Sequence, residues 1–324
     1  MKVHDLGERA LITRISKLLP HGVVLGAGED DCAVLDWNGD EYLLMTTDML
    51  HQRTDFPDEM TPWQMGWMSI AVSLSDVAAM GGKPFALVAA MGLPRDTDVG
   101  FVDGMVEGMN ACAEKFGVSI VGGDTDEHDE LTIVCTVLGR VKKDGLLRRS
   151  GANVGDMVCV TGELGTAEAG LQALSREIPQ NSKKRLTKKL FEPQPRVNEG
   201  IALSESGVVT SMMDISDGLA LSLHDMSKAS SVGFLIYGDK LPVLDEVKVI
   251  SSGLNLPLYG AGDFELLFTI KPNALGRARK ACQFTVIGEV THGDILIKKD
   301  GLTEKIEARG YEHFICVSNQ STQG

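Results

Sequence analysis

The chain has 324 residues, of which 43% are hydrophobic and 23% are charged, as expected of a globular protein with room for two domains. Its formal net charge at pH 7 is −14, which argues against binding to nucleic acid or to an anionic membrane surface. A phosphorylated ligand would therefore need metal ions to neutralise an acidic site.

The six cysteines fall singly along the chain, without a C-x-x-C pair. In a chain of this length, that spacing indicates small core residues rather than a disulfide framework. The N-terminal segment has charges between its apolar positions, unlike a signal peptide, and no apolar stretch approaches the roughly 20 residues of a membrane span. We expect a cytoplasmic protein without a membrane partner.

The N-terminal half has the pattern of a mixed α/β domain. Helical spacing of the apolar residues predicts helices over residues 5–19, 62–80 and 99–116. Short apolar runs between turn residues predict strands over residues 32–35, 42–46, 85–92, 118–121 and 131–141. Most of these strands are apolar on both faces, so we expect both faces of their sheet to be covered, by helices or by another subunit.

The polar, glycine-containing segment 148–156 indicates a junction between two domains, which we place at residues 1–147 and 148–324. In the second domain the pattern predicts helices over residues 166–176 and, rich in lysine, within 175–196. Further apolar runs predict strands over residues 157–161, 208–213, 233–236, 266–270 and 284–290. The whole chain is therefore predicted to be of the mixed α/β class, with two domains.

Aspartates recur in five short motifs, most of them where an apolar run stops. The motifs are Asp30-Asp31, Thr46-Thr47-Asp48, Ser75-Asp76, Gly122-Gly123-Asp124-Thr125 and Asp214-Ile215-Ser216-Asp217-Gly218. Mg²⁺ prefers hard oxygen ligands, usually a few carboxylates together with phosphate oxygens and water. Carboxylates that converge from distant parts of the chain would suit magnesium bound to a polyphosphate, so the sequence predicts an enzyme that uses ATP.

Each motif also has a simpler interpretation. Ser216 or Asp217 suits the N-cap of a helix that follows the apolar run before it. Asp76 is a surface residue if its helix is exposed on that side, whereas a buried Asp there needs a cation or another partner. The segment Gly122-Gly123-Asp124-Thr125 alone would be an ordinary turn, although paired glycines permit close approach of a ligand. The repetition of the pattern favours the metal site.

The sequence lacks the motifs of several other kinds of catalytic or binding site. The chain has no Walker A motif and no kinase-type glycine-rich loop with a downstream H-R-D. Its seven histidines show no zinc-ligand spacing. No G-x-S-x-G elbow is present for nucleophilic serine catalysis.

Taken in order, the motifs resemble those of the thiamine-monophosphate kinases, a family of the aminoimidazole ribonucleotide synthetase-like superfamily. The matching segments are GEDDCAV at 28–34, TTD at 46–48, SLSDVAAMGGKP at 73–84, VGGDT at 121–125, RRSGANVGD at 148–156, PQPRVNEG at 193–200, DISDGL at 214–219 and GDFELLF at 262–268. The resemblance implies that ATP phosphorylates thiamine monophosphate to thiamine diphosphate by direct in-line transfer with several Mg²⁺ ions. It also implies a homodimer in which the N-terminal mixed sheets form a β-barrel across the interface, with an α/β sandwich as the C-terminal domain.

The resemblance implies roles for individual residues. The positions expected to be linked to metal ions are Asp31, Thr46, Thr47, Asp48, Asp76, Asp124, Asp214 and Asp217. The positions expected to contact ATP are Gly123, Asp124, Arg149 and Ser216. Phosphoryl transfer needs mainly positioning and charge neutralisation, so these groups suffice without a covalent nucleophile.

The chain departs from the family pattern mainly at the positions expected to meet the acceptor, Asp55, Gly262 and Ala308. Asp55 lies in Arg-Thr-Asp-Phe, where Gly-Asn-His-Phe is common; Gly262 replaces a carboxylate; and Ala308 stands where an aromatic ring stacks on the substrate. Met68 and Ser73 also replace the usual Lys and Asn. Two alternatives therefore stay open: an ATP-dependent enzyme acting on a different small phosphorylated acceptor, and an ATP-binding regulator without turnover.

Overall fold

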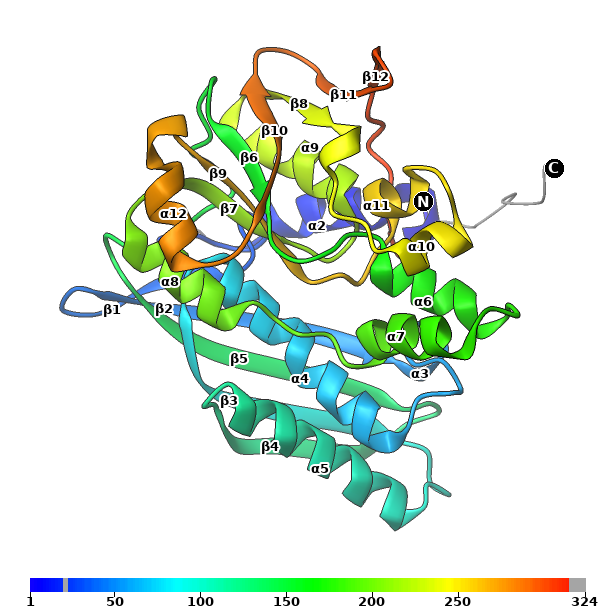
Figure 1. Ribbon diagram of the computed structural model, residues 1–324. Coiled ribbons are helices and arrows are strands. Elements are labelled where there is room, and N and C mark those ends of the chain that lie inside the picture. Colours follow the sequence, from blue (N-terminus) through cyan, green and yellow to red (C-terminus); the bar gives the residue numbers. More distant parts are fainter. Residues whose placement is uncertain (20–22, 315–324) are drawn as a thin grey trace.

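The structure, a computed structural model, describes residues 1–19 and 23–314 and contains two β-sheets, one in each half of the chain (Figure 1). The first sheet has five strands in the order β1-β2-β5-β3-β4. Their bounds are Ala33–Asn38 (β1), Glu41–His51 (β2), Lys83–Leu93 (β3), Ser119–Glu127 (β4) and Thr132–Lys142 (β5). The outer edge of β4 pairs with no strand of the described chain, and that of β1 meets only an isolated bridge between Leu25 and Val34, so the sheet is open. The expected β-barrel is not found in the described chain.

Neighbouring strands of the first sheet are antiparallel, except for β3 and β4, which run parallel. A parallel pair requires a crossover, and α5 (Val99–Lys115) provides it. Two motifs were predicted to lie at strand ends, and this is wrong for both. Thr46-Thr47-Asp48 lies in the middle of β2, and Gly122-Gly123-Asp124-Thr125 lies inside β4, opposite Val88–Met91. Both strands continue past their apolar runs because the backbone goes on pairing with β5 and β3.

Helix α4 (Pro62–Ala79) lies between the two sheets and carries one of the aspartates (Figure 1). A capping box of Thr61 and Gln64 satisfies the backbone groups at its start. Nearly every side chain from Met65 to Ala79 is buried, so the helix is covered on all sides. The predicted helix over 62–80 is confirmed, and its burial makes Asp76 an interior residue rather than a surface one.

The second sheet has seven strands in the order β12-β11-β8-β10-β6-β9-β7. Their bounds are Met157–Val160 (β6), Val209–Ile215 (β7), Gly233–Tyr237 (β8), Glu265–Ile270 (β9), Thr285–Thr291 (β10), Ile295–Lys299 (β11) and Leu302–Lys305 (β12). Helix α9 (Leu219–Ser230) packs in the core on one face of this sheet, and α8 (Val197–Ser206) and α12 (Leu275–Ala281) pack on the other. The mixed α/β class is confirmed, while β11 and β12 were not predicted.

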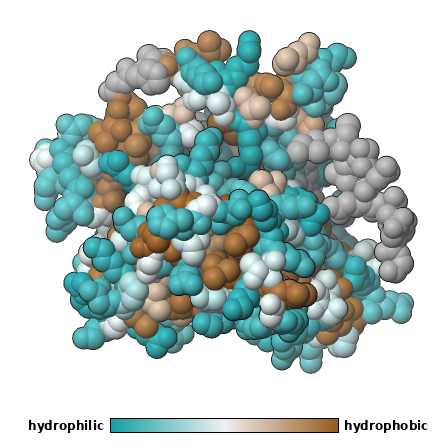
Figure 2. Space-filling view, turned by 90° about the horizontal axis from the view of Figure 1, so that it is seen from above, coloured by the Kyte–Doolittle hydropathy of each residue, from teal (hydrophilic) through white to brown (hydrophobic). Residues whose placement is uncertain are grey.

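The remaining helical elements are short. They are α1 (Val3–Leu6), α2 (Glu8–Ser16), α3 (Gln52–Asp55), α6 (Thr166–Leu174), α7 (Gln180–Phe191), α10 (Asp245–Ile250), α11 (Asn255–Tyr259) and the 3₁₀ turns Gly238–Lys240 and Pro272–Ala274. The surface above the second sheet is mainly hydrophilic, with separate hydrophobic patches (Figure 2). Among residues 1–19 and 23–314, no helix combines the length and the apolar character that crossing a membrane requires.

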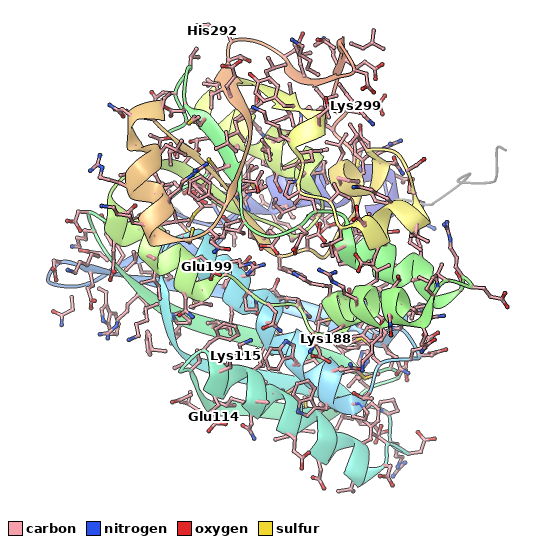
Figure 3. All side chains as sticks on the ribbon, viewed as in Figure 1. Glu114, Lys115, Lys188, Glu199, His292 and Lys299 are labelled. Atoms are coloured by element: carbon pink, nitrogen blue, oxygen red, sulfur yellow. The ribbon has the colours of Figure 1, made fainter. Side chains whose placement is uncertain are left out.

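Trp67 in α4 contacts both halves of the chain. Lys115, at the end of α5 (Figure 3), lies 5.3 Å from the ring centroid of Trp67 in α4. The indole Nε1–H of Trp67 donates a hydrogen bond to the carbonyl oxygen of Pro193 at 2.8 Å. The helices of the first sheet are thereby tied to the segment between α7 and α8.

Candidate active site

Three of the predicted metal-linked aspartates meet between the two sheets. Asp31 precedes β1, Asp76 lies in the last turn of α4, and Asp214 lies near the end of β7. One carboxylate oxygen of each residue lies within 4.8 Å of one from each of the other two. We call Asp31, Asp76 and Asp214 the acidic cluster.

Neighbouring hydroxyl groups orient two of these carboxylates. The Thr46 hydroxyl donates a hydrogen bond to Asp76 at 2.5 Å, and the Ser75 hydroxyl donates one to Asp214 at 2.6 Å. Strand β2 and helix α4 therefore help to build the cluster.

Arg149 connects the acidic cluster to the segment between the two domains. Its guanidinium Nε donates a hydrogen bond to Asp31 at 3.2 Å, and its Nη2 contacts the same oxygen. The backbone N–H of Arg149 faces both carboxylate oxygens of Asp30, at 3.2 and 3.3 Å. Asp30, to which the motif comparison assigned no role, therefore holds the backbone that positions Arg149.

The carboxyl groups around the cluster keep their protons to higher pH than free carboxyl groups do. Burial, with the nearby charge of Asp31, raises the pKa of Asp214 to about 8. Burial and the carboxylates of Asp48 and Asp214 raise the pKa of Asp76 well above its ordinary value. Burial also raises the pKa of Asp31, although the charge of Arg149 opposes this. A cation placed among these groups would stabilise their ionised forms.

The donor set fits a divalent cation that prefers oxygen. Two buried carboxylate oxygens, Asp31 Oδ2 and Asp48 Oδ2, have no hydrogen-bond partner within the described part of the chain, whereas buried polar atoms normally have one. The cluster consists of carboxylates alone. Hard oxygen ligands suit Mg²⁺, while zinc sites are usually built with His or Cys.

The structure brings only some of the other predicted metal positions to the cluster. Asp48 lies close enough that its charge raises the pKa of Asp76. Thr47, in contrast, is exposed on β2. Gly123 and Asp124 are exposed in β4, at the free edge of the first sheet, and Asp124 is not part of the acidic cluster. The eight predicted metal positions are therefore not all assembled within one chain.

Ser216 and Asp217 lie in the turn between β7 and α9. The simpler interpretation, that one of them caps α9, is wrong, because Gly218 is the cap residue and no side chain caps the helix. The Ser216 carbonyl instead accepts a hydrogen bond from the N–H of Gly262 at 2.7 Å. Burial, followed by the charge of Glu8, raises the pKa of Asp217 to about 6.

The three predicted acceptor positions lie in three separate segments. Asp55 ends α3, and its carboxylate accepts a hydrogen bond from the backbone N–H of His51 at 2.7 Å. Gly262 has a φ of +86°, a conformation that glycine adopts far more readily than other residues. Ala308 is exposed. The replacement of a carboxylate by glycine at position 262 thus agrees with the local backbone.

Sequence reasoning missed the role of Asp263. Its carboxylate accepts hydrogen bonds from the backbone N–H groups of Gly165, Thr166 and Ala167, at 2.5, 2.9 and 3.1 Å. It therefore occupies the N-terminus of α6. The available signal was the turn Gly162-x-x-Gly165, whose pattern weakly resembles a phosphate loop, and the chain fills that position with its own anion.

Sequence reasoning also missed the ion pair of Glu265 with Arg196. Glu265 is 1% exposed, and Arg196 Nε and Nη2 each donate to one of its oxygens at 2.5 Å. The pair joins β9 to the start of α8, beside a cleft of about 530 Å³ that Glu199 also lines (Figure 3). Two of the matching segments, PQPRVNEG and GDFELLF, therefore meet in this buried pair.

Two family models match the chain. The model of the AIR synthase related protein, N-terminal domain, matches residues 29–141, and that of the C-terminal domain matches residues 153–299. The fold and the site between its two sheets therefore define an AIR synthase related protein.

Curated relatives narrow this class. The thiamine-monophosphate kinase of Methanospirillum hungatei JF-1 is 44% identical over 284 residues, which cover 88% of this chain and 92% of the relative. That of Pyrococcus horikoshii is 39% identical over 288 residues, covering 88% and 90%. The solved structure of AaThiL complexed with AMPPCP and TMP aligns with a TM-score of 0.87 at 30% identity, covering 97% of this chain and 99% of AaThiL. The chain belongs to the thiamine-monophosphate kinase family.

Proposed function

We propose that this protein uses ATP to phosphorylate thiamine monophosphate to thiamine diphosphate. The observation that carries the proposal is the acidic cluster, formed by carboxylates from three separate parts of a chain of this family. The related AaThiL structure, which holds AMPPCP and TMP, supports a site for a nucleotide and a phosphorylated acceptor together.

The residues present account for the chemistry that such a transfer needs. Bound Mg²⁺ would supply positive charge next to the phosphates of both ligands. The acidic cluster would hold the ions, with Thr46 and Ser75 keeping its carboxylates oriented. Arg149, at the edge of the cluster, is placed to neutralise nucleotide phosphates. The acceptor phosphate is itself the nucleophile, so an in-line transfer needs no covalent intermediate.

We also propose that the protein is a homodimer. In it, the first sheet of one copy and the first sheet of the other would together close a barrel. Met45, Met49 and Val88 share one face of the sheet and are exposed by 42%, 55% and 40%. Exposed apolar faces mark interaction surfaces, and the outer edge of β4 offers unpaired backbone groups. Such a dimer would also explain why Asp124 lies outside the acidic cluster of its own chain. Light scattering should give twice the mass of one chain.

The direct test is ADP release from ATP, Mg²⁺ and thiamine monophosphate, with thiamine diphosphate identified by its mass. Product of that mass, formed in equal amount to ADP, is the expected result. The exposed Ala308, which offers no aromatic ring, favours a different phosphorylated acceptor as the second candidate. ADP release with such a compound and none with thiamine monophosphate would replace the first proposal, and ATP binding without any ADP release would leave a regulator.

A further inference from the structure

Polar contacts attach the N-terminal helix α2 to the second domain, beside α9 (Figure 1). No residue of α2 is buried. Arg9 Nη1 donates a hydrogen bond to a carboxylate oxygen of Asp225 at 2.6 Å, and Arg9 Nε lies 3.8 Å from one of Glu312. The Oε2 of Glu8 accepts a hydrogen bond from the backbone N–H of His313 at 2.7 Å. The ion pair of Arg9 with Asp225 therefore joins α2 to α9.

Helix α9 also contacts the backbone of two residues of the candidate site. The hydroxyl of Ser222 donates a hydrogen bond to the carbonyl oxygen of Asp214 at 3.2 Å. The hydroxyl of Ser230 donates one to the carbonyl oxygen of Arg149, also at 3.2 Å. Asp225 lies between these two serines in the same helix. The helix thereby holds a further carboxylate next to the segments that carry Asp214 and Arg149.

The charge of Asp225 acts on the ion pair of Arg149 with Asp31. Burial lowers the pKa of Arg149, but neighbouring carboxylates, among them those of Asp31 and Asp225, raise it by more. Burial is the main cause that raises the pKa of Asp31; the charge of Arg149 opposes this, and that of Asp225 adds to it. An unpaired carboxylate at position 225 would therefore draw the guanidinium of Arg149 away from Asp31, and it would repel the phosphates of a nucleotide.

Arg9 supplies the charge that matches Asp225. Their side chains are exposed by 38% and 24%, so water screens the pair less than it screens a fully exposed one. Within residues 1–19 and 23–314, Asp225 forms no other salt bridge. Without the charge of Arg9, the guanidinium of Arg149 would be the cation left to compensate Asp225.

We propose that Arg9 is a positioning residue for the nucleotide: it neutralises Asp225, and Arg149 therefore stays beside Asp31 to meet the phosphates of ATP. The inference rests on the proposed function, in which Arg149 neutralises nucleotide phosphates. Arg9 acts through Asp225 and does not need to contact the nucleotide itself. It also precedes residue 29, where the match to the family models begins.

The test measures nucleotide binding separately from turnover. Calorimetry at saturating Mg²⁺ gives the Kd of AMPPCP for the full-length wild type and its variants. Arg9→Met should weaken binding by about 3- to 10-fold, whereas Arg9→Lys, which keeps the charge, should change Kd by less than about twofold. A double variant, Arg9→Met with Asp225→Asn, removes both charges and should return Kd to within about twofold of the wild type. Asp225→Asn alone should bind AMPPCP at least as tightly as the wild type.

A matched control and the double variant separate this role from a merely structural one. Arg14→Met makes the same substitution at an exposed position in the last turn of α2 and should leave Kd unchanged. If the pair of Arg9 and Asp225 only fastened α2 to α9, Asp225→Asn and the double variant would weaken binding as much as Arg9→Met does. That result, or an unchanged Kd in Arg9→Met, would overturn the inference.

The wild type separates the inference from the proposed function. Binding of AMPPCP by the wild type, without ADP release from ATP in the presence of thiamine monophosphate, would contradict the proposed function alone. Absence of AMPPCP binding would overturn both.

Discussion

Replacing Asp263 with alanine should destabilise the protein, and by more at acidic than at neutral pH. The largely buried carboxylate accepts three backbone hydrogen bonds at the start of α6, from Gly165, Thr166 and Ala167. Their loss leaves three N–H groups in a buried turn without partners, at about 1–2 kcal/mol each. We therefore expect the free energy of unfolding to fall by about 4 kcal/mol at pH 5.5.

The pH dependence follows from the proton that Asp263 keeps. Burial raises the pKa of Asp263 from 3.8 to about 7. The unfolded chain releases this proton near pH 4, while the folded protein holds it until about pH 7, so the group's contribution to stability falls as pH rises through this range. Between pH 5.5 and 7.5 this loss amounts to about 2 kcal/mol. The free energy of unfolding of the alanine variant should therefore lie only about 2 kcal/mol below that of the wild type at pH 7.5.

Thermal unfolding at the two pH values measures both effects. The Tm of Asp263→Ala should lie roughly 8 °C below that of the wild type at pH 5.5 and roughly 4 °C below it at pH 7.5. As a control, Asp98→Ala removes the exposed cap of α5, whose carboxylate accepts a hydrogen bond from the backbone N–H of Gly100, and should cost about 1 kcal/mol. If the Tm of Asp263→Ala lies below that of the wild type by the same amount at both pH values, or by more at pH 7.5, the reasoning is refuted.

Three further substitutions test the site and the first sheet. Asp214→Ala should abolish turnover. It should also abolish the rise in Tm that Mg²⁺ gives the wild type, because only a state that binds the ion is stabilised by it. Full activity of the variant at saturating Mg²⁺ would contradict the assignment of Asp214 as a metal ligand. Arg149→Ala should raise KM for ATP, and it should lower Tm because the buried carboxylate of Asp31 loses its ion-pair partner. A change confined to the KM of the acceptor would argue against a role of Arg149 in binding ATP. Gly123→Ala should disrupt the pairing of β3 with β4, because its Cβ would lie 1.9 Å from the carbonyl oxygen of Ala89. Gly122→Ala, whose Cβ would have 3.9 Å to its nearest neighbour, should be tolerated, and equal Tm values for these two glycine variants would be evidence against the predicted clash.

The elements with local signals could be predicted from the sequence. Helix α4 combines a capping box, a long apolar run and glycines just beyond its end, and all three depend on residues near one another in the chain. The same holds for α5 and for the apolar strands of both sheets. Boundaries were less predictable, because β2 and β4 continue through polar motifs for as long as a neighbouring strand accepts their hydrogen bonds.

The candidate site, too, could be predicted from the sequence only in part. Repeated aspartate motifs were enough to predict that carboxylates converge on a metal, since so many acidic residues beside apolar runs need a common explanation. They were not enough to separate Asp31, Asp76 and Asp214, which meet within one chain, from Asp124, which lies on a free sheet edge. That distinction depends on how the two sheets pack around α4.

The sequence by itself determined the class of fold and the family, and it predicted the convergence of Asp31, Asp76 and Asp214, because hydrophobic periodicity and short motifs are properties of neighbouring residues. Only the tertiary structure decided the roles of Asp30 and Asp263. Asp30 and Asp263 hold backbone N–H groups about a hundred residues away. Hydrogen bonds over such separations leave no periodic pattern in the chain, so they appear only in the folded structure: that of Asp30 joins the two domains, and those of Asp263 form within the second.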